Sequence, residues 1–141
     1  MLTVSIPELD LTEVWLDSDP RRNRLRVTFP INRWAGARDT AVVYFEIEPG
    51  ERLAAHTDSA EEILYIVAGE AEAHVGDERG RVRAGDLAVI PEMVPHGLVN
   101  VGDEPVKVVG FFCQPEIIST FDEPVQPVGR AVLNQGAPVA V

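Results

Sequence analysis

Apolar and polar residues alternate with a period of two over several stretches of this chain, a pattern typical of strands that bury one face. In Ala41–Ile47 the apolar side chains at every second position share one face. Residues 24–29 and Glu70–Val75 repeat the same alternation. Each of these three segments is therefore predicted to be a half-buried strand.

Other runs complete the pattern of short strands. Residues 63–68 are continuously apolar and rich in β-branched side chains, which predicts a strand covered on both faces. Residues 86–90 and 106–113 are further strand candidates. Pairs of glycine, proline and aspartate separate the runs, and one strand plus its turn recurs about every 8–12 residues, which favours an all-β sandwich or barrel. The one candidate for a short helix or turn is residues 6–16.

The length of 141 residues predicts a single domain, residues 1–141. The predicted strands place its core barrel at about residues 24–113. Residues 114–141 are rich in proline and are predicted to form an extended or irregular C-terminal arm over the barrel or a partner subunit. The last few residues of the arm are expected to be disordered.

A formal net charge of −11 narrows the classes of partner. Nucleic acid is excluded because binding it needs a basic surface, and an anionic membrane surface is excluded for the same reason. No run of about 18 apolar residues predicts a membrane span. The N-terminus lacks the basic start of a secretory signal, so a cytoplasmic location is expected. The single cysteine, Cys113, cannot form an intrachain disulfide and is expected to be buried.

Two separate stretches hold residues suited to coordinating a metal ion. His56 and Asp58 are two residues apart, so on a strand their side chains point to the same face. Glu62 opens an apolar run, where a buried carboxylate is costly unless something positive lies beside it. His96 leads into another apolar run. Two imidazoles and two carboxylates suit a divalent transition metal, but spacing alone leaves open a second interpretation, histidines hydrogen-bonded in the core.

The spacing of these stretches resembles the two motifs of the cupin superfamily. The positions that match the family's spacing are, in chain order, Gly50, His56, Glu62, Gly69, Gly85, Pro91, His96 and Asn100. The resemblance covers about residues 40–113. It implies an all-β fold with little helix, namely a double-stranded β-helix or cupin barrel, which is a jelly-roll relative.

Two positions depart from the family pattern. Asp58 stands where the family has its second histidine, and Met93 stands where it has a glycine. The resemblance implies that His56, Glu62 and His96 ligate the metal and that Asp58 occupies the fourth ligand position. Three roles are open for Asp58: it ligates the metal, it holds a metal-bound water, or it points to solvent. Iron, manganese, nickel and zinc are all compatible with this set.

A metal with open coordination positions predicts a metal-dependent enzyme that acts on a small oxygen-bearing organic substrate, of dioxygenase, isomerase or cyclase type. Asp58 is the candidate catalytic residue, as a general base. The alternative is a non-catalytic small-ligand-binding or sensor protein, because fold does not dictate function. The resemblance also implies a homodimer, with residues 24–29 and 117–121 as candidate interface segments.

Overall fold

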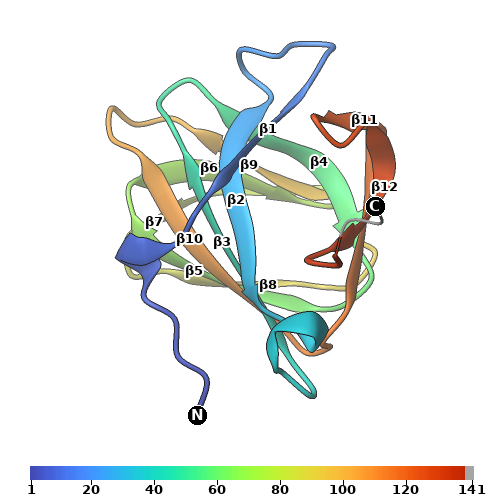
Figure 1. Cartoon of the computed structure of the whole chain (residues 1–141). Helices are drawn as coiled ribbons and strands as arrows, with labels where there is room; N and C mark the ends of the chain where they lie inside the picture. The colour runs from blue at the N-terminus through green and yellow to red at the C-terminus, as the bar shows by residue number, and fades with distance from the viewer. Residues whose placement is uncertain (139–141) are drawn as a thin grey trace.

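Residues 1–138, the part of the chain that the computed structural model describes, form a curled sheet of twelve strands with two short 3₁₀ helices (Figure 1). The elements in chain order are η1 (Ile6–Glu8), β1 (Thr12–Leu16), β2 (Arg24–Ile31), η2 (Arg33–Ala35), β3 (Ala41–Ile47), β4 (Arg52–Asp58), β5 (Glu62–Ala68), β6 (Glu70–Val75), β7 (Glu78–Arg83), β8 (Leu87–Ile90), β9 (His96–Asn100), β10 (Val106–Phe112), β11 (Ile117–Gln126) and β12 (Arg130–Gln135).

The sheet order is β7-β6-β9-β4-β11-β1-β2-β3-β10-β5-β8, and β12 pairs with β11 beside this path. Neighbouring strands along this order run antiparallel, and so do β11 and β12. The predicted all-β barrel with little helix is therefore confirmed. No helix within residues 1–138 has the length and apolar character that crossing a membrane requires.

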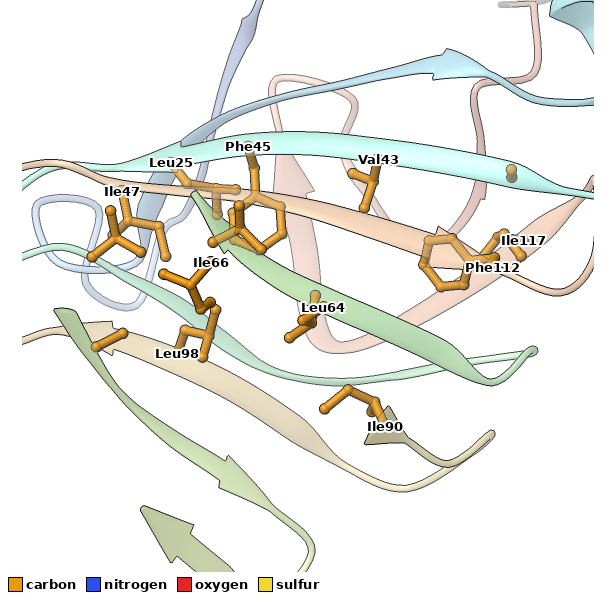
Figure 2. Close-up of a cluster of buried hydrophobic side chains, with 14 of the residues drawn as sticks. Leu25, Val43, Phe45, Ile47, Leu64, Ile66, Ile90, Leu98, Phe112 and Ile117 are labelled. Carbon is orange, nitrogen blue, oxygen red and sulfur yellow. The ribbon is translucent and has the colours of Figure 1, made fainter. Parts of the chain in front are cut away.

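Period-two alternation located the strands that bury one face. Strands β3 and β6 have the predicted bounds, and β2 continues two residues past the predicted segment. Side chains from β2, β3, β5, β9 and β10 point into the space that the sheet encloses, as Figure 2 shows. The core includes Leu25, Val43, Phe45, Ile47, Leu64, Ile66, Ile90, Leu98, Phe112 and Ile117, which Figure 2 labels.

Strand β7 was not predicted. The sequence of β7 is mostly charged and its side chains are largely exposed, so it shows no apolar period. It is held instead by its ladder with β6 and by cross-strand ion pairs, Arg79 with Glu72 and Arg81 with Glu70. Residues 6–16, the helix candidate, form the 3₁₀ turn η1 and then strand β1.

The C-terminal arm is more regular than the sequence predicts. Strand β11 pairs with β4 and β1, and β12 folds back on β11, so residues 117–135 contribute a hairpin to the sheet rather than irregular chain. Figure 1 shows this hairpin in red beside β4. The prolines of the arm did not prevent its strands from pairing with their neighbours. The expected disorder of the last residues falls mainly on 139–141, which lie outside the described residues.

The outer face of β5 corrects another prediction. Its inner side chains are buried, but Ile63, Tyr65 and Val67 on the opposite face are about two-fifths exposed, so the strand is covered on one face within this chain. Cys113 is exposed rather than buried, because it follows Phe112 at the end of β10 and falls on the side opposite that buried ring.

Met93 adopts a positive φ of 61°, a backbone conformation that favours glycine. It stands where the resembled family has glycine, and its N–H donates to the carbonyl of Asp58 over 2.8 Å. We expect Met93→Gly to stabilise the fold by about 0.5–1 kcal/mol, because relief of the left-handed strain exceeds glycine's entropy cost. The side chain is 58% exposed, so little packing is lost. Chemical denaturation measures the change.

The matched control is Met93→Ala, which removes the same side chain but keeps the strained backbone. Its stability should stay below that of Met93→Gly. Equal stabilities for the two variants would show that the left-handed strain at this turn does not exceed glycine's entropy cost.

Candidate metal centre

Three strands bring the four predicted ligands together inside the barrel. His56 and Asp58 end β4, Glu62 begins β5, and His96 begins β9. His56 lies directly across from His96 in the β4–β9 ladder, with their ring centroids 4.3 Å apart. All four side chains are buried and line one internal cavity.

Hydrogen bonds to the backbone determine which ring nitrogen each histidine presents. Nδ1 of His56 lies 2.9 Å from the carbonyl oxygen of Ala54, and Nδ1 of His96 lies 3.0 Å from that of Val94. A carbonyl can only accept, so each Nδ1 carries the proton and donates. In the neutral rings Nε2 then has a free lone pair, as in metal-ligating histidines whose second nitrogen is held by a backbone carbonyl.

Both free nitrogens face carboxylate oxygens. Nε2 of His56 lies 3.5 Å from Oδ2 of Asp58, and Nε2 of His96 lies 3.2 Å from the same oxygen. Nε2 of His96 also lies 3.7 Å from Oε1 of Glu62. Lone pairs directed at one another require a cation between them, either a proton or a metal ion. Ligand atoms bonded to one ion at about 2.0–2.2 Å lie roughly 3–3.6 Å apart, so the donor set fits a divalent metal.

The geometry ranks the donors differently from the sequence. Donor atoms of His56, Asp58 and His96 all lie within 4.8 Å of one another, so Asp58 sits among the histidines and does not point to solvent. Glu62 lies close to one of these three residues, His96, whose Nε2 faces Oε1 of Glu62. Its carboxylate lies over Gly110 of β10, where an added Cβ would come within contact of Oε2. The absence of a side chain at Gly110 thus leaves room for Glu62.

The charges of the metal-free site are strongly coupled. Burial by itself would lower the pKa of His96, but the carboxylates of Asp58 and Glu62 outweigh burial and raise the pKa of His96 to about 10. Burial by itself would raise the pKa of Asp58, but His56 and His96 hold this pKa well below its usual range. Burial raises the pKa of Glu62. At neutral pH the metal-free site therefore holds a proton on His96 opposite an ionised Asp58.

Two further residues of the site, Ser119 and Phe121, come from β11 and were not identified from the sequence. Ser119 lies directly across from Asp58, is almost fully buried, and donates its hydroxyl to Oδ1 over 2.5 Å. Phe121 lies across from His56 and stacks on its ring at 4.7 Å between centroids. Ser119 leaves Oδ2 of Asp58 facing the histidines, so it orients the carboxylate. A single serine outside both motifs carried no sequence signal for this role.

We expect Ser119→Ala to weaken binding of a divalent metal by about 10–100-fold, because partners that orient a ligand typically contribute that much. Isothermal titration calorimetry with Zn²⁺ measures the change. The control is Thr120→Ala, whose side chain is exposed on the other face of the same strand. An affinity for Zn²⁺ that is the same in Ser119→Ala and Thr120→Ala would show that the hydroxyl does not hold Asp58 for the metal.

The third histidine lies outside this group. His74 on β6 is half-buried across from Gly97 of β9, where its ring occupies the space that a side chain at Gly97 would need. Burial lowers the pKa of His74. It does not point into the cavity that the four donors line.

The sequence comparisons agree with the spacing of the two motifs. Residues 43–112, about half of the chain, match the family described as the Cupin domain. An uncharacterised protein of Methanocaldococcus jannaschii is 35% identical over 51 residues. That match covers 36% of this chain and 41% of the relative, so the chain aligns with less than half of that relative's length.

Three solved structures share the fold. An uncharacterised Klebsiella pneumoniae protein with a double-stranded β-helix domain is 26% identical, with a TM-score of 0.58 over 64% of this chain and 77% of its own. An oxalate decarboxylase of Lactobacillus farciminis, in complex with formate, is 27% identical, with a TM-score of 0.64 over 75% of this chain and 32% of its own. A candidate sugar phosphate isomerase of Acidithiobacillus ferrooxidans, 18% identical, has a TM-score of 0.64 over 86% of this chain and 80% of its own and supports the fold alone.

Proposed function

We propose that this chain, which belongs to the cupin superfamily, holds a divalent transition metal in its barrel and acts as a metal-dependent enzyme on a small oxygen-bearing organic substrate. The observation that carries the proposal is the pair of histidines whose Nδ1 atoms are engaged by backbone carbonyls and whose Nε2 atoms face Asp58. A core histidine that served packing alone would not need a buried carboxylate beside its free nitrogen.

His56, Asp58 and His96 would hold the ion, with Glu62 as the fourth donor. A bound metal supplies Lewis acidity and a template for substrate oxygens, and iron also supplies dioxygen activation. Two nitrogen and two oxygen donors suit iron, manganese, nickel or zinc. Metal analysis by mass spectrometry after reconstitution with each ion tests this step, and a stoichiometry near one per chain supports it. A protein that retains no ion after reconstitution would contradict the proposal.

The reaction is of dioxygenase, isomerase or cyclase type, and Asp58 is its candidate general base. Asp58 is ionised in the metal-free protein, so it can accept a proton, but a pKa held well below its usual range makes it a weak base in that state. Most of the cavity wall is apolar, so a bound substrate would lie against few polar groups other than the donors. Dioxygen uptake and isomerisation assays with small diketones and catechols screen for the activity. In any assay that succeeds, Asp58→Asn with full activity would remove the base role.

The second candidate function is a non-catalytic binder or sensor of a small ligand. Its support is the largely apolar cavity, which can hold a ligand without chemistry. The two functions separate in one experiment, in which metal-loaded protein is incubated with each compound and the mixture is analysed by NMR. Conversion of a compound favours the enzyme. Saturable binding of the compound, with no conversion under any metal, favours the binder.

We also propose that the chain forms a homodimer through the outer face of the sheet at β5, β8 and β10. The exposed apolar side chains of this outer face are Ile63, Tyr65, Val67, Leu87, Val89 and Phe111. They lie side by side, because Ile63 pairs with both Phe111 and Val89 across the ladders. A continuous apolar surface of this kind is typical of an interface. The earlier candidate segments fit less well, since β2 and β11 each have strand partners on both edges.

A second copy is the occupant that this face favours. Strand β8 ends the sheet order, so within residues 1–138 its outer edge has no strand partner. An antiparallel pairing of β8 with β8 of a second copy would satisfy that edge and join the two apolar faces. Light scattering after size exclusion should give twice the 15.4 kDa mass of the chain. Val89→Arg should halve that mass, whereas Val132→Arg, exposed on β12, should not.

A further inference from the structure

The wall of the internal cavity carries little polarity beyond the donor set. The cavity measures about 90 Å³, and apart from the donors its wall is mostly leucine, valine and phenylalanine from strands along the whole chain. Two more polar side chains line it, Ser119 and Gln135, and Ser119 already donates to Asp58. Among the described residues, no lysine or arginine lines this cavity. A ligand bound here would therefore meet the metal at one end and apolar groups elsewhere.

The charge of the site leaves no counter-charge for a strongly anionic ligand. A divalent ion would be neutralised by the carboxylates of Asp58 and Glu62, with both histidines neutral. Burying a dianion or a phosphate group beside this neutral site would leave charge unpaired in an apolar cavity, which is costly. The net charge of −11 opposes the approach of anions from solution as well. The site thus disfavours the oxalate and sugar phosphate classes that two structural neighbours are named for.

The volume sets a limit on size. An apolar protein cavity of about 150 Å³ accommodates benzene, so a cavity of 90 Å³ suits a molecule no larger than benzene. We propose that the substrate of this cavity is a small uncharged molecule with a short aliphatic body and with oxygen atoms on two neighbouring carbons, such as a hydroxyketone or a diketone. This assignment rests on the metal-dependent function proposed above and narrows its substrate class.

Strand β12 closes part of the cavity and supplies a specificity-determining side chain. Leu133 and Gln135 lie on the face of β12 that lines the cavity. The side chain of Val132 lies on the opposite, exposed face of the strand. Since β12 pairs with β11 alone, it is the peripheral part of the wall. Leu133 therefore contacts the aliphatic body of the ligand without any role in holding the metal.

Calorimetric titration of three compounds tests the assignment on both metal-free and Zn²⁺-loaded protein. Acetoin is an uncharged hydroxyketone with as many non-hydrogen atoms as oxalate, and glyceraldehyde 3-phosphate represents sugar phosphates. Acetoin is expected to bind at least tenfold more tightly than either anion to both forms. Zinc content is checked after each titration so that removal of zinc by oxalate is not counted as binding. Acetoin that fails to bind, or an anion that binds as tightly, overturns the assignment.

Two variants locate the ligand. Leu133→Ala should weaken acetoin binding by about fivefold through lost packing, whereas Val132→Ala should leave it unchanged. Equal effects of the two substitutions would overturn the role of β12. Failure of the proposed function looks different, because protein that takes up no zinc contradicts the metal centre while the metal-free titrations still rank the three compounds.

Discussion

His96→Ala is expected to abolish stoichiometric binding of a divalent metal. His96 is the one donor that contacts both carboxylates, with Nε2 at 3.2 Å from Asp58 and 3.7 Å from Glu62. Without it, one histidine and two carboxylates remain, and Glu62 loses the donor through which it contacts the group. The loss in affinity should exceed the roughly 10–100-fold effect of removing a residue that only orients a ligand. Competition with a chromophoric chelator for Zn²⁺ measures the affinity of each variant.

The matched control is His74→Ala, which removes a half-buried histidine from the same pair of strands but outside the cavity. It should keep one metal ion per chain and near-native affinity. Circular dichroism establishes that both variants are folded before the affinities are compared. A His96→Ala protein that is folded and binds Zn²⁺ as tightly as His74→Ala would rule out the assigned centre.

The affinity for metal should rise by about tenfold for each pH unit between about pH 6.5 and 8.5. In the metal-free protein the pKa of His96 is raised to about 10, so over this range His96 carries a proton that a metal ion must displace. Each unit of pH lowers the cost of removing that proton by about 1.4 kcal/mol. The same chelator competition, repeated in a series of buffers, gives the slope. An affinity independent of pH would show that His96 is neutral before metal arrives.

Stability of the metal-free protein should follow the opposite trend. Because the folded protein raises the pKa of His96, the resulting stabilisation is fully present below its unfolded value of about 6.5 and is lost as pH rises towards 10. At acidic pH the lowered pKa of Asp58 matters instead, because the stability that the ionised carboxylate contributes is lost as pH falls below about 4. Saturation with metal should remove the decline at high pH, since the ion replaces the proton.

The sequence predicted the four donors because each carries its chemistry in a short local pattern. His56 and Asp58 share a face through period two, and the motif spacing added Glu62 and His96. It could not rank them, because their distances depend on how β4, β5 and β9 curl around the cavity. Ser119 and Gly110 were missed for the same reason. Their roles arise from the strands opposite, Asp58 across from Ser119 and Glu62 above Gly110, and neither contact leaves a local pattern.

The fold was predictable where burial falls on one face of a strand. Strand β3 shows its inner side chains directly as alternation. Strands β7 and β12 have mostly exposed or half-buried side chains, so their positions are fixed by backbone pairing that the sequence does not reveal. The apolar run in β5 predicted a strand covered on both faces, but only one face is covered. Its outer side chains are as apolar as its inner ones and remain exposed in the single chain.

The position of β11 beside β4 affects the order in which the centre is assembled. The four donors lie between residues 56 and 96, so all are synthesised before Ser119 emerges. Until β11 returns to pair with β4, the carboxylate of Asp58 has no fixed rotamer and the ring of His56 has no Phe121 to stack against. We therefore expect a growing chain to offer only part of the proposed metal site, and the site to reach its full affinity only after the C-terminal hairpin has paired with β4.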